Sequence, residues 1–321
     1  MERIDLTGRV AIVTGAGRGI GRAHAVALAE RGAAVVVNDI GAGIDGSGVD
    51  DGPAAEVVAE ITAAGGRAVA SIDDVATPDG GQALVSRAQA EFGAVDILVH
   101  NAGVVLAGPF ASQPLADVRR VLDVHLLGAW HVGQPAWRDM AARGFGRIVL
   151  TTSGAIFGHP MVAAYAAAKH GIIGLTRSLH QEAAMAGVDI KVNALAPIAA
   201  TRMAREAQKE RFGPLMDPAA VGAAAVYLAS PACELSGEVV HAGAGHWCRI
   251  FLGQTLGWAN GAPGVTAEAL GDHIAEAFDP AGFIVPPDTN ASTDLIHQQA
   301  TGRSEAMSRV QIAPDEVESR L

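Results

Sequence analysis

Aromatic residues are scarce in this sequence: Phe, Trp and Tyr together make up 4% of its 321 residues. The core must therefore be built mainly from Ala, Val, Leu and Ile, and hydrophobic residues do reach 50% of the chain. Glycine is abundant, with 39 residues, and supplies tight turns between strands and helices. This combination favours a buried parallel sheet covered by helices.

Cysteine, clustered positive charge and long apolar runs are also lacking. The two cysteines, Cys233 and Cys248, have neither metal-binding nor redox spacing, which is typical of free thiols in a reducing cytoplasm. The net charge of −11, without a basic cluster, argues against a nucleic-acid-binding surface. No apolar run reaches the ~18 residues needed to span a bilayer, and the first residues lack a signal-peptide pattern. We therefore expect a cytoplasmic protein without a membrane span, a metal site or a nucleic-acid partner.

A glycine-rich segment near the N-terminus carries the first functional signal. Residues 9–14 (RVAIVT) form a short apolar strand that leads into GAGRGIG, residues 15–21, and then into a helix over 22–31. A strand, a glycine loop and a helix in this order are typical of dinucleotide sites, where glycines admit a pyrophosphate to the helix N-terminus. The residues expected to contact the dinucleotide here are Gly15, Arg18, Gly19, Ile20 and Gly21.

The next predicted strand, residues 33–38, is followed directly by Asp39. A carboxylate at this place accepts hydrogen bonds from the adenosine ribose hydroxyls and repels a 2′-phosphate. Asp39 therefore favours NAD over NADP, although Arg18 offers a positive charge that would attract that phosphate. The following loop, Ile40–Gly52, is rich in Gly, Asp and Ser but lacks the ligand order of a calcium loop. We interpret it as an insertion over the adenosine end of the cofactor.

Further polar and small residues fall where other predicted strands end. Asp74 and Val75 follow the strand over 67–72, and Asp74 fits two roles equally well, contact with the adenine amino group or capping of the helix that starts near Thr77. The remaining candidates for cofactor contact are Asn101, Ala102 and Gly103 after the strand over 95–100, and Pro197, Ile198 and Thr201 after the strand over 188–194. Ligands of open parallel sheets bind beyond the carboxyl ends of the strands, where all these residues gather.

A hydroxyl, a phenol and an ammonium come together further along the chain. The strand over 147–153 ends in Thr152 and Ser153, and the next helix carries Tyr165 and Lys169, which are four residues apart and share one face. A free phenol titrates near pH ~10, and a neighbouring ammonium favours its phenolate, so the pair is a candidate general acid and base. With a hydroxyl nearby to bind the reacting oxygen, this set suits alcohol oxidation or carbonyl reduction, which requires a hydride carrier. On its own, the pattern also fits a half-buried tyrosine beside a lysine.

Seven predicted strands, with helices between most of them, indicate an α/β protein with a Rossmann-type, doubly wound parallel sheet of about seven strands. We expect this single domain to occupy residues 1–246. The segment over 115–143 is broadly helical, with an interruption near Gly133-Gln134-Pro135. From 247 to 321 the alternation stops, and we expect an extension that is irregular or partly helical.

With these residues in place, the sequence resembles the short-chain dehydrogenase/reductase family of the classical type. The resemblance spans roughly residues 5–245 and rests on Thr14-Gly15-x-x-x-Gly19-x-Gly21, Asn101-Ala102-Gly103, Ser153, Tyr165-x-x-x-Lys169, and Pro197 with Thr201. It implies that Tyr165 transfers the proton, that Lys169 holds the nicotinamide ribose and lowers the tyrosine pKa, and that Ser153 orients the substrate oxygen. Thr201 would contact the cofactor carboxamide.

Two positions depart from the family pattern. The family serine lies 13 residues before the tyrosine, where this chain has Thr152, and Ser153 is one residue closer. We favour Ser153 as the catalytic hydroxyl, with Thr152 as the alternative. His125 stands where many members carry an asparagine that supports a proton-relay water. A histidine can form hydrogen bonds in that role, and a histidine bonded only to the backbone is an equal alternative.

A narrower likeness is to the dehydrogenase part of peroxisomal multifunctional enzyme type 2, carried by Asn38–Gly41, Ile61–Val69, Asp123–Trp130 and Gly243–Trp247. It implies oxidation of a (3R)-hydroxyacyl-CoA with NAD. We therefore expect an NAD-dependent oxidoreductase that interconverts a secondary alcohol and a ketone. The alternatives are a different alcohol or ketone, the use of NADP, or a nucleotide-binding protein with weak catalysis. The family resemblance also implies a homodimer or homotetramer formed through the long helices.

Overall fold

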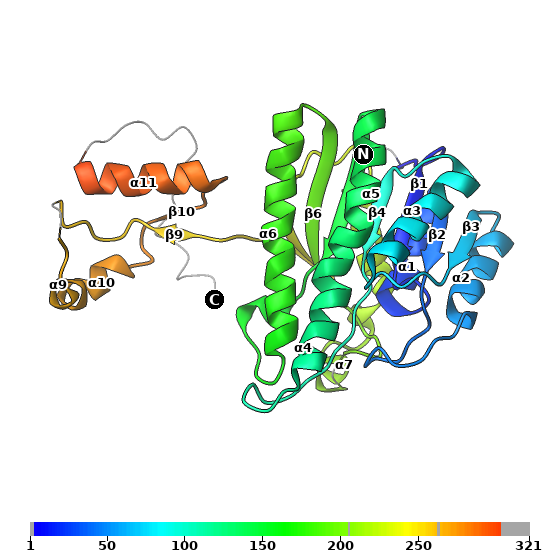
Figure 1. The fold of residues 1–321 in the computed structure, drawn as a ribbon, viewed down its shortest axis with the longest axis horizontal. Helices are drawn as coiled ribbons and strands as arrows, with labels where there is room; N and C mark the ends of the chain where they lie inside the picture. Colours follow the sequence, from blue (N-terminus) through cyan, green and yellow to red (C-terminus); the bar gives the residue numbers. More distant parts are fainter. Residues whose placement is uncertain (1–2, 205, 262–263, 303–321) are drawn as a thin grey trace. The chain divides into compact units, whose positions relative to one another are not determined.

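The computed structural model describes residues 3–204, 206–261 and 264–302. Eight strands form one sheet in the order β3-β2-β1-β4-β5-β6-β7-β8 (Figure 1). The strands are β1 (Val10–Thr14), β2 (Ala34–Asn38), β3 (Arg67–Ser71), β4 (Ile97–His100), β5 (Phe145–Thr151), β6 (Asp189–Ile198), β7 (Val239–Gly243) and β8 (His246–Ile250). Strands β1 to β7 are parallel. The predicted Rossmann-type parallel sheet is confirmed, and one antiparallel strand is added to it.

Helices cover both faces of the sheet. They are α1 (Gly19–Ala29), α2 (Gly52–Ala63), α3 (Pro78–Phe92), α5 (Gly128–Arg143), α6 (Ala163–Ala186) and α8 (Pro218–Leu228). Helices α1, α2 and α8 pack on one face through buried residues such as Leu28 and Val57. Helices α3, α5 and α6 pack on the other face, where Met140 and Ile172 are buried. Both cores consist almost wholly of aliphatic side chains, as the scarcity of aromatic residues requires.

The arrangement of strands around β1 shows at which edge of the sheet a ligand can bind. In the central strand β1, Thr14 pairs with Asn38 of β2 on one side and with His100 of β4 on the other. The chain adds β2 and β3 on the first side and then crosses to β4 on the second. This reversal leaves a crevice beyond the carboxyl ends of β1 and β4, where ligands of such sheets bind.

The expected interruption of the segment over 115–143 lies elsewhere. Helix α4 (Leu115–Leu122) continues into a π-helical turn, Asp123–Leu127, and then into α5, which runs unbroken through Pro135. Pro135 and its neighbour Ala136 are buried against the core, and this packing maintains the helix despite the missing N–H. The irregular turn instead carries His125, and π-helical turns are frequent at functional sites.

Strand β8 was not predicted, because the alternation of strands and helices was expected to stop at residue 247. It pairs antiparallel with β7, from Gly243 opposite His246 to Val239 opposite Ile250. The two connecting residues, Ala244 and Gly245, both have positive φ, of 51° and 73°. Two such residues form the tight turn that matches the twist of a hairpin. Thus β8 continues the main sheet past the predicted boundary after residue 246.

The described chain divides into two compact units, one up to Ile250 and one from Phe251 onward. The second unit contains β9 (Gln254–Thr255), α9 (Ala267–Asp272), α10 (Ile274–Ala277), β10 (Phe283–Ile284) and α11 (Thr289–Thr301). Ile284 and Leu295 are its only buried hydrophobic residues among those described. Its remaining residues, from 303, lie outside the described part. No helix within the described ranges combines the length and apolar character needed to cross a membrane.

Candidate active site

A cavity of about 1060 Å³ opens at the carboxyl ends of the strands. All the residues singled out from the sequence for cofactor or substrate contact line it. These are Gly15, Arg18, Gly19, Ile20, Gly21, Asp39, Asp74, Val75, Asn101, Ala102, Gly103, His125, Ser153, Tyr165, Lys169, Pro197, Ile198 and Thr201. The fold therefore brings residues from six strand ends, from the helices α1 and α6 and from the π-helical turn of His125 into one space.

The glycine loop is packed against its neighbours so closely that side chains are excluded. A Cβ on Gly21 would lie 2.0 Å from the carbonyl oxygen of Gly15, and a Cβ on Gly15 would lie 2.8 Å from the Cα of Ala102. Asn101 fixes the loop, since its Nδ2 donates to the carbonyl oxygens of Thr14 (3.2 Å) and Gly15 (3.1 Å). These glycines and Asn101 thus shape the loop that would hold a pyrophosphate.

The N-terminus of α1 is open to a ligand. Its N-cap residue, Arg18, makes no capping hydrogen bond with its side chain, and the first turn contains no acidic residue. The first N–H groups of a helix have no partner within the helix and carry partial positive charge. Because this helix end lines the cavity, its donors fit the pyrophosphate of a dinucleotide.

Asp39 links the glycine loop to the insertion that follows β2. Its Oδ2 accepts a hydrogen bond from the Gly17 N–H at 2.8 Å, and its Oδ1 accepts one from the Gly41 N–H at 2.7 Å. Each carboxylate oxygen can accept a second hydrogen bond, so the side chain can still bind ribose hydroxyls at the cavity wall. Arg18, by contrast, pairs with Asp50 of the insertion at 3.8 Å.

Asp74 does not cap the helix that follows it. The cap of α3 is Thr77, whose side chain accepts a hydrogen bond from the Gly80 N–H at 3.1 Å. Asp74 instead forms a local turn, accepting from the Ala76 N–H at 2.9 Å, and pairs with Arg120 at 3.5 Å. Of its two predicted roles, the contact with the cavity is the one that this geometry permits, and Val75 lines the cavity beside it.

Thr14 and His100 organise the turn after β4. The Thr14 hydroxyl accepts hydrogen bonds from the N–H groups of Asn101 and Ala102, both at 3.0 Å, and lies 3.2 Å from His100 Nδ1. With both lone pairs in use, the hydroxyl must donate to Nδ1. The proton of the neutral His100 ring is therefore on Nε2, which is buried without a partner.

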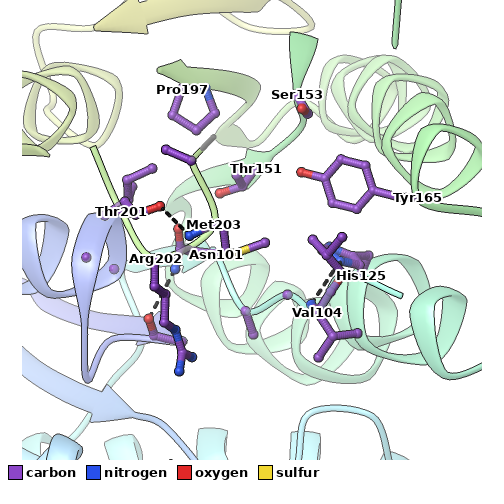
Figure 2. Close-up of a pocket in the computed structure, with 18 of the residues that line it drawn as sticks. Asn101, Val104, His125, Thr151, Ser153, Tyr165, Pro197, Thr201, Arg202 and Met203 are labelled. Atoms are coloured by element: carbon purple, nitrogen blue, oxygen red, sulfur yellow. Dashed lines mark hydrogen bonds between the residues drawn. The ribbon is translucent and has the colours of Figure 1, made fainter. Parts of the chain in front are cut away.

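Ser153, not Thr152, faces the tyrosine. Both Ser153 and Tyr165 line the cavity, and Figure 2 shows the phenol oxygen of Tyr165 pointing into it below Ser153. Thr152 is buried, and its hydroxyl donates to the carbonyl oxygen of Lys169 at 2.8 Å. Burial raises the pKa of the Tyr165 phenol, and the nearby Ser153 hydroxyl acts in the opposite direction.

Lys169 is buried on the same face of α6. Its Nζ donates to the carbonyl oxygen of Thr151 at 2.5 Å and lies 5.6 Å from the centre of the Tyr165 ring. Burial lowers the pKa of the Lys169 ammonium to about 7. Burial is the largest effect on the pKa of the Tyr165 phenol, and the lowering by Lys169 that the family resemblance implies stays a prediction.

His125 is held by the backbone of Val104. Its Nε2 lies 3.1 Å from the Val104 nitrogen and 2.8 Å from the Val104 oxygen, while Nδ1 is buried without a partner (Figure 2). Burial lowers the pKa of His125 well below 6.5, helped by the Lys169 charge, so the ring is neutral at neutral pH. The ring meets Tyr165 edge-on, with centroids 5.1 Å apart. The backbone bond is the alternative that the structure supports.

The end of the cavity where the family resemblance predicts the nicotinamide is formed by β6 and the loop after it. Strand β6 extends to Ile198, beyond its predicted end, and so includes Pro197. Thr201 Oγ1 accepts from the Met203 N–H at 3.2 Å. The methyl group of Thr201 faces Gly19, where a Cβ would come within 3.2 Å. Thr201 therefore bridges this loop and the glycine loop.

The sequence reasoning missed the apolar wall of the cavity. Val104, Val105, Val162, Met203 and Met216 line it without having been predicted. These residues follow β4, precede α6 or follow β6. They are therefore close in the sequence to residues that were predicted, and this closeness is the signal that could have identified them. Together they offer a hydrophobic surface to the carbon skeleton of a substrate.

Comparison with known proteins agrees with this geometry. Residues 9–211 match the short chain dehydrogenase family. This chain belongs to that family. Its members are oxidoreductases that use NAD(H) or NADP(H), and the glycine loop, Tyr165 and Lys169 occupy one cavity here.

Two curated relatives are similar over most of the chain. A short-chain type dehydrogenase/reductase of Mycobacterium tuberculosis is 42% identical over 245 residues, covering 76% of this chain and 85% of the relative. Peroxisomal multifunctional enzyme type 2 of Mus musculus is 39% identical over 251 residues, covering 78% of this chain. The match covers only 34% of that larger protein.

Two solved structures share the fold. A short chain dehydrogenase from Mycobacterium avium has a TM-score of 0.70 and 40% identity, covering 85% of this chain and 95% of that one. A 7α-hydroxysteroid dehydrogenase, solved with NADH and 7-oxo glycochenodeoxycholic acid, has a TM-score of 0.67 and 32% identity. The match covers 75% of this chain and 95% of the hydroxysteroid dehydrogenase chain.

Proposed function

We propose that this protein is an NAD-dependent dehydrogenase that oxidises the hydroxyl of a 3-hydroxyacyl-CoA to a ketone. The observation that carries the proposal is that Ser153, Tyr165 and Lys169 line the same cavity as the glycine loop. When bound, the nicotinamide supplies the hydride acceptor. The choice of NAD rests on Asp39, whose carboxylate lies at the cavity wall.

The residues around the reacting alcohol have separate tasks. Ser153 donates or accepts a hydrogen bond at the substrate oxygen and so orients it toward Tyr165. Tyr165, in its phenolate form, accepts the hydroxyl proton of the alcohol as hydride leaves the carbon, and the resulting phenol returns the proton in the reverse direction. Lys169 lies against the tyrosine ring and would bind the ribose hydroxyls of the cofactor. His125 holds Val104, part of the wall beside these groups.

The acyl-CoA assignment rests on similarity to peroxisomal multifunctional enzyme type 2 and on the apolar wall of the cavity. A second candidate substrate is a steroid or another bulky secondary alcohol, favoured by similarity to the 7α-hydroxysteroid dehydrogenase. We further propose a homodimer or homotetramer located in the cytoplasm, with the dehydrogenase domain in residues 1–246 and an extension over 247–321.

Formation of NADH, followed by absorbance, tests the proposal. The panel contains (3R)- and (3S)-hydroxyacyl-CoAs, steroid alcohols and simple secondary alcohols, each with NAD and with NADP. Turnover of one acyl-CoA enantiomer with NAD supports the proposal, whereas turnover only of alcohols that lack CoA overturns the acyl-CoA assignment. Binding of NAD without any turnover would overturn the catalytic function and favour a nucleotide-binding role.

A further inference from the structure

The adenosine end of the cavity contains two residues with opposing effects on cofactor choice. Asp39 repels the 2′-phosphate of NADP, while Arg18, in the glycine loop, would attract it. Both residues line the cavity. A site with this pair alone would discriminate weakly between the two cofactors, because the arginine offsets the carboxylate.

A third residue changes this balance. The Asp50 carboxylate lies 3.8 Å from the Arg18 guanidinium, and Asp50 is not among the residues that line the cavity. It therefore pairs with the arginine from outside the cofactor space. The second carboxylate offsets the positive charge of Arg18 without occupying the place of the ribose.

The insertion holds Asp50 firmly in this position. The Asp50 N–H donates to the Ile40 carbonyl oxygen at 2.9 Å, and the Asp50 Oδ1 accepts from the Gly52 N–H at 3.0 Å. Gly41, with φ of 71°, packs so closely that a Cβ there would lie 1.8 Å from the Asp50 carbonyl oxygen. Asp50 is thus fixed against the residues next to Asp39.

Hydrogen bonds also fix the start of the insertion. Asp39 accepts from the Gly41 N–H at 2.7 Å, and the Arg202 guanidinium donates twice to the Ala42 carbonyl oxygen, at 3.2 Å each. The Ile44 carbonyl oxygen accepts from the Val105 N–H at 3.0 Å. The carboxylates of Asp39 and Asp50 are therefore held by one connected set of hydrogen bonds.

We propose that Asp50 is a specificity-determining residue that neutralises Arg18 and thereby makes the site reject NADP. The inference rests on the proposed NAD dependence and adds to it a residue outside the cofactor pocket. Asp50 acts through Arg18 and does not contact the cofactor. Its effect must therefore depend on Arg18 being present, which separates it from a general role in folding the loop.

Direct titration of the full-length protein with NADH and with NADPH, followed by nicotinamide fluorescence, tests this inference. Asp50→Asn removes the charge and keeps an oxygen for the Gly52 N–H. We expect it to raise the affinity for NADPH by about fivefold and the affinity for NADH much less, since one charge near the phosphate is lost. The gain should shrink at high ionic strength.

Two further variants provide the controls. Asp51→Asn removes an equal charge one residue away, on an exposed side chain that makes no capping bond to α2. Asp50→Asn in an Arg18→Gln background should give no gain for NADPH. An equal gain from Asp51→Asn, or a gain that persists without Arg18, would overturn the inference.

The same titration separates this inference from the proposed function. Preference of the parent protein for NADH, with a ratio of affinities that Asp50→Asn does not change, overturns the inference alone. Preference of the parent protein for NADPH overturns the proposed NAD dependence and the inference with it. Binding of neither cofactor overturns the proposed dehydrogenase function as well.

Discussion

The Thr152 hydroxyl donates its hydrogen bond to the Lys169 carbonyl oxygen at 2.8 Å, which turns it away from the reacting groups. The next residue, Ser153, lines the cavity with Tyr165 and accepts from the Ala155 N–H at 3.2 Å. Successive side chains of a strand end point to opposite sides, so only one of these hydroxyls can face the cavity centre. The geometry favours Ser153 as the residue that orients the substrate.

Ser153→Ala should therefore lower kcat by about 100-fold, as expected when a hydrogen bond to the reacting oxygen is lost. Thr152→Val should keep kcat within tenfold but lower the free energy of unfolding by about 1 kcal/mol, the value of one buried hydrogen bond. Steady-state kinetics and thermal unfolding of both variants provide the measurements. The opposite pattern, with the larger kinetic loss for Thr152→Val, would assign the catalytic role to threonine.

Tyr165→Phe should reduce kcat by about 1000-fold, because the variant keeps the ring and loses the group that accepts the proton. The affinity for NADH, measured by fluorescence, should change little, since the glycine loop and Asp39 are untouched. This contrast separates catalysis from cofactor binding. Turnover that survives the substitution would show that another group transfers the proton.

Many of the residues expected to contact the cofactor could be predicted from the sequence, because they follow predicted strands directly. Gly15, Asp39 and Asn101 follow strands with clear apolar patterns, and parallel strands place such ends at one edge. The choice between Thr152 and Ser153 could not be made in this way. It depends on the last residue of β5, and a shift of one residue reverses which side chain faces the cavity.

The π-helical turn and the β7–β8 hairpin were not predicted from the sequence, for different reasons. The turn at Asp123–Leu127 depends on contacts of His125 with Val104, residues far apart in the sequence. The hairpin did leave a local signal, because Ala244-Gly245 lies in a glycine-rich stretch suited to a tight turn.

His125 should act as a positioning residue that holds Val104. Its Nε2 bonds to the backbone of that residue, and Gly103 leaves room for the ring, since a Cβ there would lie 2.3 Å from His125 Cε1. His125→Leu removes these bonds and should lower kcat by about 10-fold to 100-fold. His125→Asn restores a donor and an acceptor and should recover most of the loss. Equal kcat values for the two variants would contradict this role.

Asp39 should set the preference for NAD. Removing its charge in Asp39→Asn keeps an acceptor oxygen for Gly17 or Gly41 and should lower the ratio of kcat/KM for NAD to that for NADP by about tenfold or more. Asp39→Ala should lower it further, because the ribose hydroxyls lose their acceptor. Parallel kinetics with both cofactors give the ratio, and an unchanged preference in both variants would refute the role of this carboxylate.

His24 on α1 should make the protein less stable in acid. The ring is fully buried, both of its nitrogens lack a partner, and burial lowers its pKa from 6.5 to about 4. The unfolded chain takes up a proton near pH 6.5, whereas the folded chain does so only near pH 4. Stability from this residue is therefore present above pH 6.5 and is lost as the pH falls, by about 3 kcal/mol at pH 4.

His24→Leu should remove this loss and also stabilise the fold at neutral pH by about 1 kcal/mol, because two unpaired polar atoms leave the core. Denaturant unfolding between pH 4 and pH 7 measures both effects. His100 and His125 are also buried with lowered pKa values, so the variant keeps part of the acid sensitivity. His170→Leu, at an exposed position on α6, controls for the loss of a histidine as such. A pH dependence in His24→Leu as steep as in the parent protein would show that His24 finds a partner in the folded state.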